Sequence, residues 1–178
     1  GPTSLSEVYG GSSAQVTING AGGASLPSGY AAWPSSGVLL SELSINNPEG
    51  VTLSTNKTVN TNLYLTNGLL NLSTFTLTMA SETGIVRNRG SLSSAPVFNP
   101  GINVSYQYSD QPTNTSYELP AAKGIVNNIV VNTTNDVYLS SDVYLSGVLA
   151  VNNGGLHLSG HKLYYESHDV VFYGNNYI

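Results

Sequence analysis

The sequence predicts an all-β protein built as a single-stranded, right-handed parallel β-helix (a β-solenoid) of about seven to eight coils. Three observations carry this prediction. Short apolar-x-apolar triplets are separated by Asn, Thr, Ser and Gly; a segment of about 37 residues returns later at a constant offset; and the triplets recur about every 20 residues. A β-sandwich, which also uses many short strands, is the alternative fold.

The segment from Leu43 to Met79 shows the pattern of short strands most clearly. Alternation over two or three residues indicates a strand with one buried face, and Gly and Asn between strands favour turns because both accept positive φ. We therefore expect the apolar members of each triplet to point inward. The five triplets are Leu43–Ile45, Val51–Leu53, Leu63–Leu65, Leu70–Leu72 and Leu77–Met79.

The same segment returns without a gap between Ile129 and Tyr165, at an offset of about 86 residues by subtraction. Residues that are identical at this offset fall on apolar positions or in turns, as with Val51/Val137, Gly68/Gly154 and Leu70/Leu156. We therefore expect one continuous β-helix over 16–178, with a first repeat over 16–101 and a second, truncated repeat over 102–178. Residues 1–15 are expected to hold an N-terminal cap and, at Gly1-Pro2, a remnant of tag cleavage.

A shorter period of about 20 or 21 residues lies inside the repeat and predicts individual coils. Just after the strand of most coils an Asn recurs, which predicts a stacked ladder of side-chain amides because successive coils lie ~4.8 Å apart. The alternative is that Asn is simply abundant and common in turns. The expected ladder residues are Asn46, Asn67, Asn88, Asn132, Asn153 and Asn175, and the strands before them include Gly84–Val86 and Val104–Tyr106.

Two segments interrupt the regular coils. Tyr117–Pro120 resembles Tyr30–Pro34 of the first copy, and both are expected to be loops that leave the coil. Arg87 and Arg89 lie near the junction of the copies and are expected to point to solvent. The chain stops where a further coil should begin, so we expect the natural protein to continue, and open coils could associate end to end.

Composition excludes several function classes. Charged residues make up 8%, and the five Lys and Arg against ten Asp and Glu argue against nucleic acid or an anionic membrane as partner. Cysteine is absent, so disulfides and thiolate metal sites are excluded. No apolar run approaches ~18 residues, so no membrane insertion is expected.

Groups that could carry catalysis are few and scattered. The densest titratable segment contains His157, His161 and the turn Glu166/His168/Asp169. His157 and His161 should belong to neighbouring faces, and three polar residues in one turn are usually only a turn. The sequence therefore predicts no enzyme activity, no metal site and no cofactor.

The two copies differ in their outward residues, where Thr52, Thr58 and Thr78 of the first become tyrosines in the second. Tyr144 and Tyr164 are one coil apart and should form a pair ~4.8 Å apart, and Tyr138 and His157 should form another. Two interpretations stay open: stacked aromatics stabilise neighbouring strands, or an exposed aromatic surface binds a glycan or a partner protein.

A low-complexity pattern recurs in Val104–Pro120, Asn127–Asn132, Val137–Ser141 and Leu156–Leu163. These segments resemble repeats of large surface proteins of the Bacteroidetes. This resemblance implies a β-solenoid in a cell-surface or secreted protein and carries no catalytic residues. We therefore expect a structural or adhesive stalk segment, with a carbohydrate-binding or carbohydrate-processing β-helix as the alternative.

Overall fold

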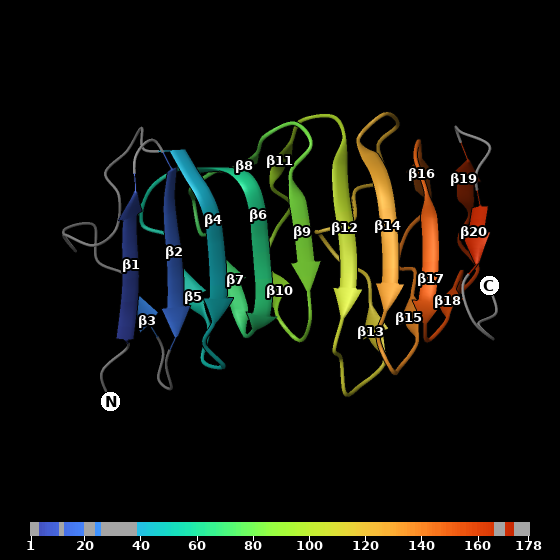
Figure 1. The fold of residues 1–178 in the computed structure, drawn as a ribbon, viewed down its shortest axis with the longest axis horizontal. Coiled ribbons are helices and arrows are strands. Elements are labelled where there is room, and N and C mark those ends of the chain that lie inside the picture. Colours follow the sequence, from blue (N-terminus) through green and yellow to red (C-terminus); the bar gives the residue numbers. More distant parts are fainter. Residues whose placement is uncertain (1–3, 11–12, 20–23, 26–38, 166–169, 173–178) are drawn as a thin grey trace.

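A computed structural model describes residues 4–10, 13–19, 24–25, 39–165 and 170–172. Within these residues the protein is all-β and contains no helix, and its parallel strands stack as a β-solenoid of about six turns (Figure 1). The predicted fold class is confirmed, whereas the coil number is slightly smaller than the seven to eight expected. The β-sandwich alternative is wrong, because Leu63–Leu65 and Leu70–Leu72 lie on different sheets rather than pairing with each other.

Each turn contributes strands to up to three faces. The first face carries the longest strands, and each pairs in parallel with the equivalent strand of the next turn. Its strands are β2 (Ser13–Asn19), β4 (Leu39–Asn46), β6 (Lys57–Asn67), β9 (Gly84–Arg87), β12 (Ile102–Gln107), β14 (Val126–Asn132), β17 (Leu149–Asn153) and β20 (Val170–Phe172). The one antiparallel partner in the described chain is β1 (Ser4–Gly10), which pairs with β2 at the N-terminal end.

The second face is divided into two separate sheets. One contains β3 (Ala24–Ser25), β5 (Val51–Thr52), β7 (Leu69–Asn71) and β10 (Ser91–Leu92), and the other contains β13 (Thr113–Asn114), β15 (Val137–Tyr138) and β18 (Leu156–His157). No strand pairing joins β10 to β13. The solenoid is therefore continuous along its first face and broken along its second, at the junction between the two copies.

The third face closes each turn. Its strands are β8 (Leu77–Met79), β11 (Val97–Phe98), β16 (Val143–Leu145) and β19 (Leu163–Tyr165), joined by the first residues of β4, β6 and β14. Because β4, β6 and β14 run round the corner between the third and first faces, both faces belong to one hydrogen-bonded sheet.

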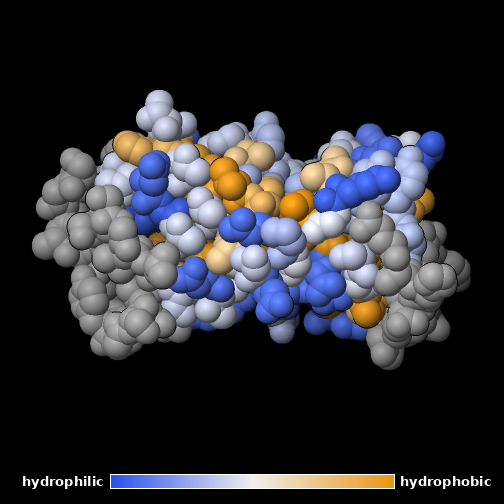
Figure 2. Space-filling view, turned by 90° about the horizontal axis from the view of Figure 1, so that it is seen from above, coloured by the Kyte–Doolittle hydropathy of each residue, from blue (hydrophilic) through white to orange (hydrophobic). Residues whose placement is uncertain are grey.

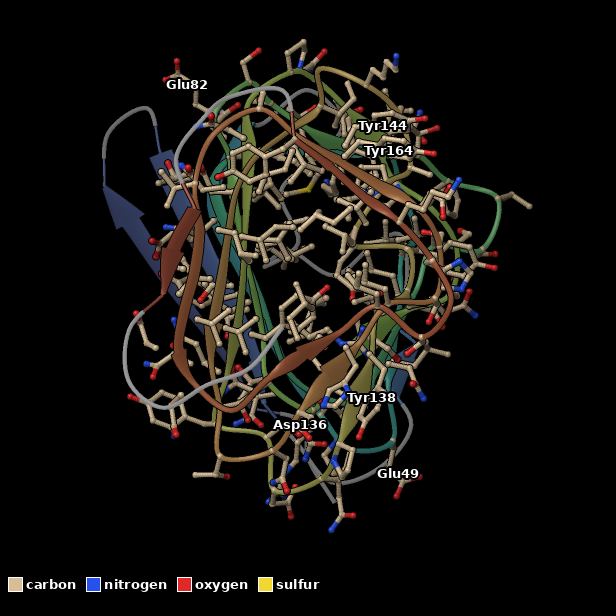
Figure 3. All side chains as sticks on the ribbon, turned by 90° about the vertical axis from the view of Figure 1, so that its right-hand side faces the viewer. Glu49, Glu82, Asp136, Tyr138, Tyr144 and Tyr164 are labelled. Atoms are coloured by element: carbon tan, nitrogen blue, oxygen red, sulfur yellow. The ribbon has the colours of Figure 1, made fainter. Side chains whose placement is uncertain are left out.

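The core is a column of aliphatic side chains that runs along the axis. Every residue of the predicted inward set from Leu43 to Leu77 is at most 2% exposed. In the second copy the counterparts are also buried, except that Leu158 and Leu163 are only partly covered. The view along the axis shows side chains filling the interior of the turns (Figure 3).

The two copies share their backbone geometry as well as their residue pattern. Gly68 and Gly154 have φ values of 81° and 78°, and Ser73 and Ser159 have values of 54° and 53°. The side chain of Asn56 accepts from the N–H of Thr76, and Asp142 accepts from Lys162 in the same way, each at 2.9 Å. The two sequence copies therefore share the same loop conformations and the same side-chain hydrogen bonds to the backbone.

The turns differ mainly at the junction of the copies. Paired residues along the first face are Leu43, Leu63, Ile85, Val104, Ile129, Leu149 and Val170, so that, by subtraction, successive turns take 20, 22, 19, 25, 20 and 21 residues. The longest turn contains Tyr117–Pro120, and it lies beside the break in the second face.

Candidate functional site

The predicted aromatic pairs form. Tyr144 and Tyr164 stack with their ring centroids 4.5 Å apart and their planes 8° from parallel. Tyr138 and His157 stack at 4.6 Å and 17°. Each pair joins two successive turns, because β16 pairs with β19 and β15 with β18 in register. The side chains of Tyr144 and Tyr164 lie together at the edge of the cross-section, and Tyr138 lies at a separate place (Figure 3).

Stacking covers part of the ring surface in each pair. In each pair the flat faces meet along the solenoid axis, so the ring surface that could stack on a sugar is partly used within the pair. Nζ of Lys123 also lies 5.1 Å from the centroid of the Tyr144 ring. Lys123 comes from the preceding turn and Tyr164 from the following one, so they approach Tyr144 from opposite sides.

Polar groups beside the second pair fix its histidine. Nε2 of His157 lies 3.0 Å from Oδ2 of Asp136, and both side chains are about half exposed. Nδ1 of His161 lies 3.7 Å from Oδ1 of Asp142, at a different corner. Within the described residues no three His, Cys, Asp or Glu side chains are grouped to hold a metal ion. The Glu166/His168/Asp169 turn lies outside those residues.

The expected Asn series is aligned along the axis but is not hydrogen-bonded side chain to side chain. Asn46 pairs in register with Asn67, and Asn132 with Asn153. Among the described residues no hydrogen bond joins the amides of two members, and Oδ1 of Asn88 is buried without a partner. Asn175 lies outside the described residues.

A different polar series occurs at the opposite end of the same strands. The Asn62 amide donates to Glu42 at 3.2 Å, and the Asn128 amide donates to Oδ1 of Asn103 at 2.6 Å. Oδ1 of Asn128 in turn accepts from the N–H of Val148 at 2.7 Å. Gly84 occupies the register position between Asn62 and Asn103, and a Cβ there would lie 2.3 Å from Oδ1 of Asn62.

A buried ion pair lies at the break in the second face. Arg87 donates to Oε1 of Glu118, whose side chain is completely buried while that of Arg87 is 11% exposed. The same oxygen accepts from the Tyr106 hydroxyl and from the N–H of Ser116, each at 3.0 Å. Burial, and then the neighbouring carboxylate of Glu118, raises the pKa of Tyr106 well above its ordinary value of 10.0.

Arg87 also connects the two turns that lack strand pairing. Its Nε donates to the carbonyl of Gly90 and its Nη1 to the carbonyl of Asn114, both at 2.9 Å. Gly90 precedes β10 and Asn114 ends β13, so the guanidinium bridges the turns where backbone hydrogen bonds are missing. The prediction that Arg87 points to solvent is wrong, whereas Arg89 does lie at the surface and pairs with Asp110 at 2.6 Å.

The loop at Tyr117–Pro120 does not simply leave the coil. Glu118 and Leu119 are buried, while Tyr117 is 49% exposed. The loop thus folds back over the break, with its acidic residue directed inward. The sequence signal for this was the alternation Ile85-x-Arg87, which places Arg87 in the inward column that contains Leu65, Tyr106 and Val131. The predicted strand Gly84–Val86 was displaced by one residue, which reverses every side chain.

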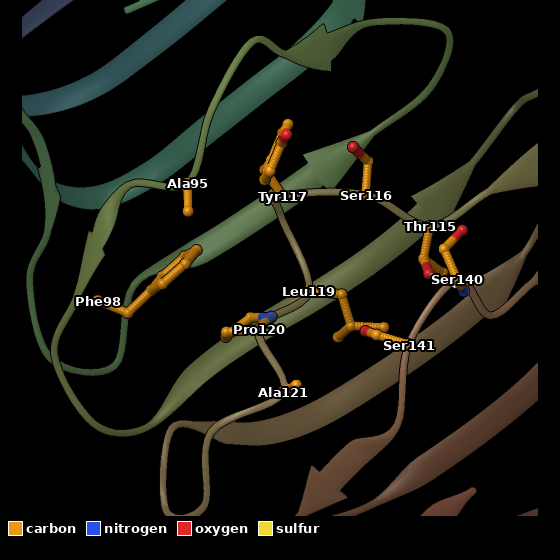
Figure 4. Close-up of a pocket in the computed structure, with 10 residues that line it drawn as sticks. All are labelled: Ala95, Phe98, Thr115, Ser116, Tyr117, Leu119, Pro120, Ala121, Ser140 and Ser141. Atoms are coloured by element: carbon orange, nitrogen blue, oxygen red, sulfur yellow. Dashed lines mark hydrogen bonds between the residues drawn. The ribbon is translucent and has the colours of Figure 1, made fainter. Parts of the chain in front are cut away.

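Two cavities flank the break. The larger, of about 570 Å³, is lined by Ala95, Phe98, Thr115, Ser116, Tyr117, Leu119, Pro120, Ala121, Ser140 and Ser141 (Figure 4). The smaller, of about 380 Å³, is lined by Arg87, Asn88, Arg89, Ser109, Asp110, Gln111, Pro112, Thr113 and Asn114. Seen from above, apolar patches alternate with polar ones along the surface, with no single apolar band (Figure 2).

The fold and these contacts define a β-solenoid with stacked outward rings and an interrupted second face. Comparison of the chain with protein-family models, curated protein sequences and solved structures finds no match. The described residues also contain no helix long and apolar enough for a membrane span.

Proposed function

We propose that this chain is a rigid structural segment, a stalk or spacer, of an extracellular bacterial surface protein, and that it performs no catalysis. The observation that supports this most directly is the continuous parallel pairing of the first face from β2 to β20. Strand hydrogen bonds, the Asn62 and Asn128 contacts and both ring pairs all join one turn to the next. Such a chain of contacts resists bending between turns and holds its two ends at a fixed separation.

Rigidity can be measured with two spin labels, because the chain has no cysteine of its own. Ser44 and Ala150 occupy equivalent outward positions five turns apart along the first face, which corresponds to about 24 Å at ~4.8 Å per turn. With both replaced by labelled cysteine, electron–electron distance measurements should give one narrow distribution near this value. A broad distribution would contradict a rigid spacer.

Exposure at the cell surface requires its own test. Antibodies raised against the protein should label intact cells of the source organism, and protease added outside should remove the label. Labelling that appears only after the cells are permeabilised would contradict the proposal.

A second candidate function is adhesion through the ring pairs to a glycan or a surface protein. It is favoured by the exposure of His157 and of Tyr164, which is 36% exposed. Replacing Tyr144 and Tyr164 by Thr, as at Thr58 and Thr78 of the first copy, should abolish binding to glycan arrays or whole cells with little change in fold. Binding that survives the double replacement would exclude the ring pair as the adhesive site.

A further inference from the structure

The larger cavity has the features of a small-molecule site rather than of a packing defect. It lies beside the break in the second face, where the longest turn folds back, and its lining residues come from three successive turns of the solenoid. Its volume of about 570 Å³ is within the range of ligand pockets, which is roughly 300–1,000 Å³. It is also separate from the stacked ring pairs, whose residues do not line it.

The walls of the cavity are of two kinds. Phe98, Tyr117, Leu119 and Pro120 supply apolar surface, including two aromatic rings, on one side of the view in Figure 4 and at its centre. Hydroxyl groups are supplied by Thr115, Ser116, Ser140 and Ser141. Among the described residues, no charged side chain lines the cavity.

Three of the four hydroxyls are available to a ligand. Thr115 Oγ1 accepts from the N–H of Ser140 at 2.9 Å. The hydroxyls of Ser116, Ser140 and Ser141 make no hydrogen bond to another residue in the described part of the chain. Each can therefore donate one hydrogen bond and accept others from a bound molecule.

The wall formed by Tyr117 and Leu119 is held from beneath by the buried ion pair. Glu118, between them in the chain, is fixed by Arg87, by the Tyr106 hydroxyl and by the N–H of Ser116. A buried ion pair is seldom more stabilising than apolar residues of the same volume. Its presence in a largely apolar core is explained if it positions the loop that forms the cavity.

From these features we infer that the cavity binds a neutral saccharide unit, one or two pyranose rings in size. A pyranose has a face of C–H groups that packs on aromatic and aliphatic surface, and a rim of hydroxyls that match serine and threonine. The lack of any lining charge disfavours uronic acids, phosphosugars and nucleotides, which would lose their hydration without gaining a counter-charge. This site goes beyond the spacer role and does not depend on it.

The test is a titration of isotope-labelled protein followed by amide chemical shifts, using maltotriose, cellotriose, mannotriose, xylotriose and N-acetylchitotriose as neutral probes and glucuronic acid as the charged control. At least one neutral probe should shift amides of 115–121 and 140–141, with a Kd on the order of 1 mM or tighter, and glucuronic acid should not. Tyr117→Ala should weaken that binding roughly tenfold. Ser140→Ala with Ser141→Ala should weaken it several-fold.

The controls separate this site from the alternatives. Tyr144→Thr with Tyr164→Thr should leave the Kd within about twofold, because those rings do not line the cavity. The inference is overturned if no neutral probe shifts the cavity amides, or if glucuronic acid binds as well as they do. It is also overturned if the saccharide shifts fall at Tyr144 and Tyr164 instead. A Tyr117→Phe variant, which keeps the ring, guards against misfolding and should retain binding.

Discussion

The two arginines near the junction allow a matched test of the buried ion pair. Arg87 and Arg89 are two residues apart, but the Arg87 side chain is 11% exposed and pairs with a fully buried carboxylate, whereas Arg89 and Asp110 are each 55% exposed. Arg87→Met should therefore reduce the free energy of unfolding by roughly 3–5 kcal/mol, because Glu118 would stay buried without a counter-charge. Arg89→Met should change it by only about 0–1 kcal/mol.

Two further variants identify the cause of that loss. Glu118→Gln keeps an acceptor for Tyr106 and Ser116, and Arg87 keeps the carbonyls of Gly90 and Asn114, so the cost should fall to about 1–3 kcal/mol. The triple variant Arg87→Met, Tyr106→Phe, Glu118→Leu removes every polar member of the cluster. It should be more stable than Arg87→Met alone, since a buried pair replaced by apolar residues often costs little.

Urea unfolding followed by circular dichroism gives the midpoint and the slope for each variant, and an unchanged slope shows that the two-state comparison holds. The reasoning is refuted if Arg87→Met costs no more than Arg89→Met. It is refuted equally if the triple variant is less stable than Arg87→Met. Should Arg87→Met fail to fold, Glu118→Gln against Arg89→Met remains a valid comparison.

Four other predictions concern the core, the turns, the Asn contacts and the Tyr106 hydroxyl. Leu70→Ala and Leu156→Ala, both at 0% exposure and at equivalent positions, should each cost roughly 2–5 kcal/mol in urea unfolding; a loss below 1 kcal/mol at either would mean that the column can collapse. Gly68→Ala should strongly reduce the melting temperature, because φ of Gly68 is +81° and the new Cβ would lie 1.7 Å from the carbonyl oxygen of Asn47. Gly160→Ala, at φ +84° but with no atom within 4 Å of the new Cβ, should cost only about 1–2 kcal/mol of stability. Equal melting temperatures for the two variants would contradict this. Asn128→Ala should cost about 1–3 kcal/mol and Asn132→Ala much less, and the reverse order in thermal unfolding would favour the amide ladder first expected. The pKa of Tyr106 is raised in the folded state, so the stability that its neutral hydroxyl contributes is complete below pH 10 and is lost as the pH rises through the folded-state pKa. Tyr106→Phe should therefore reduce the loss of stability above pH 10. An unchanged dependence of stability on alkaline pH would contradict the burial of that hydroxyl.

The solenoid and its core could be predicted because they rest on two regular signals. Alternation identifies which residues face inward, and the offset between copies identifies which residues lie in equivalent positions. The same subtraction placed Tyr144 over Tyr164 and Tyr138 over His157, as the structure confirms. The direction of the ring faces could not be predicted, because it depends on side-chain rotation and on neighbours such as Lys123.

The junction could not be predicted because its features arise from departures from regularity. The predicted strand near Arg87 was displaced by one residue, so Arg87 was assigned to the outside although it occupies a core position. The buried ion pair was missed for the same reason. The cavity lies beside the junction at which β10 and β13 do not pair, and these two strands follow connections of unequal length. Loop lengths can be read from the sequence. The backbone groups that lose their hydrogen-bond partners because of those lengths cannot.

The spacing of the two copies has a consequence for any arrangement of such units in series. Leu43 and Ile129 are joined by four register steps, through Leu63, Ile85 and Val104, so one repeat closes on a whole number of turns. Adding a unit therefore lengthens the rod by about 19 Å, at ~4.8 Å per turn, while keeping equivalent residues on the same side. A polymeric ligand lying along that side would meet equivalent positions at regular intervals. Weak contacts at each would then combine into avidity, since the second contact forms at a high effective concentration.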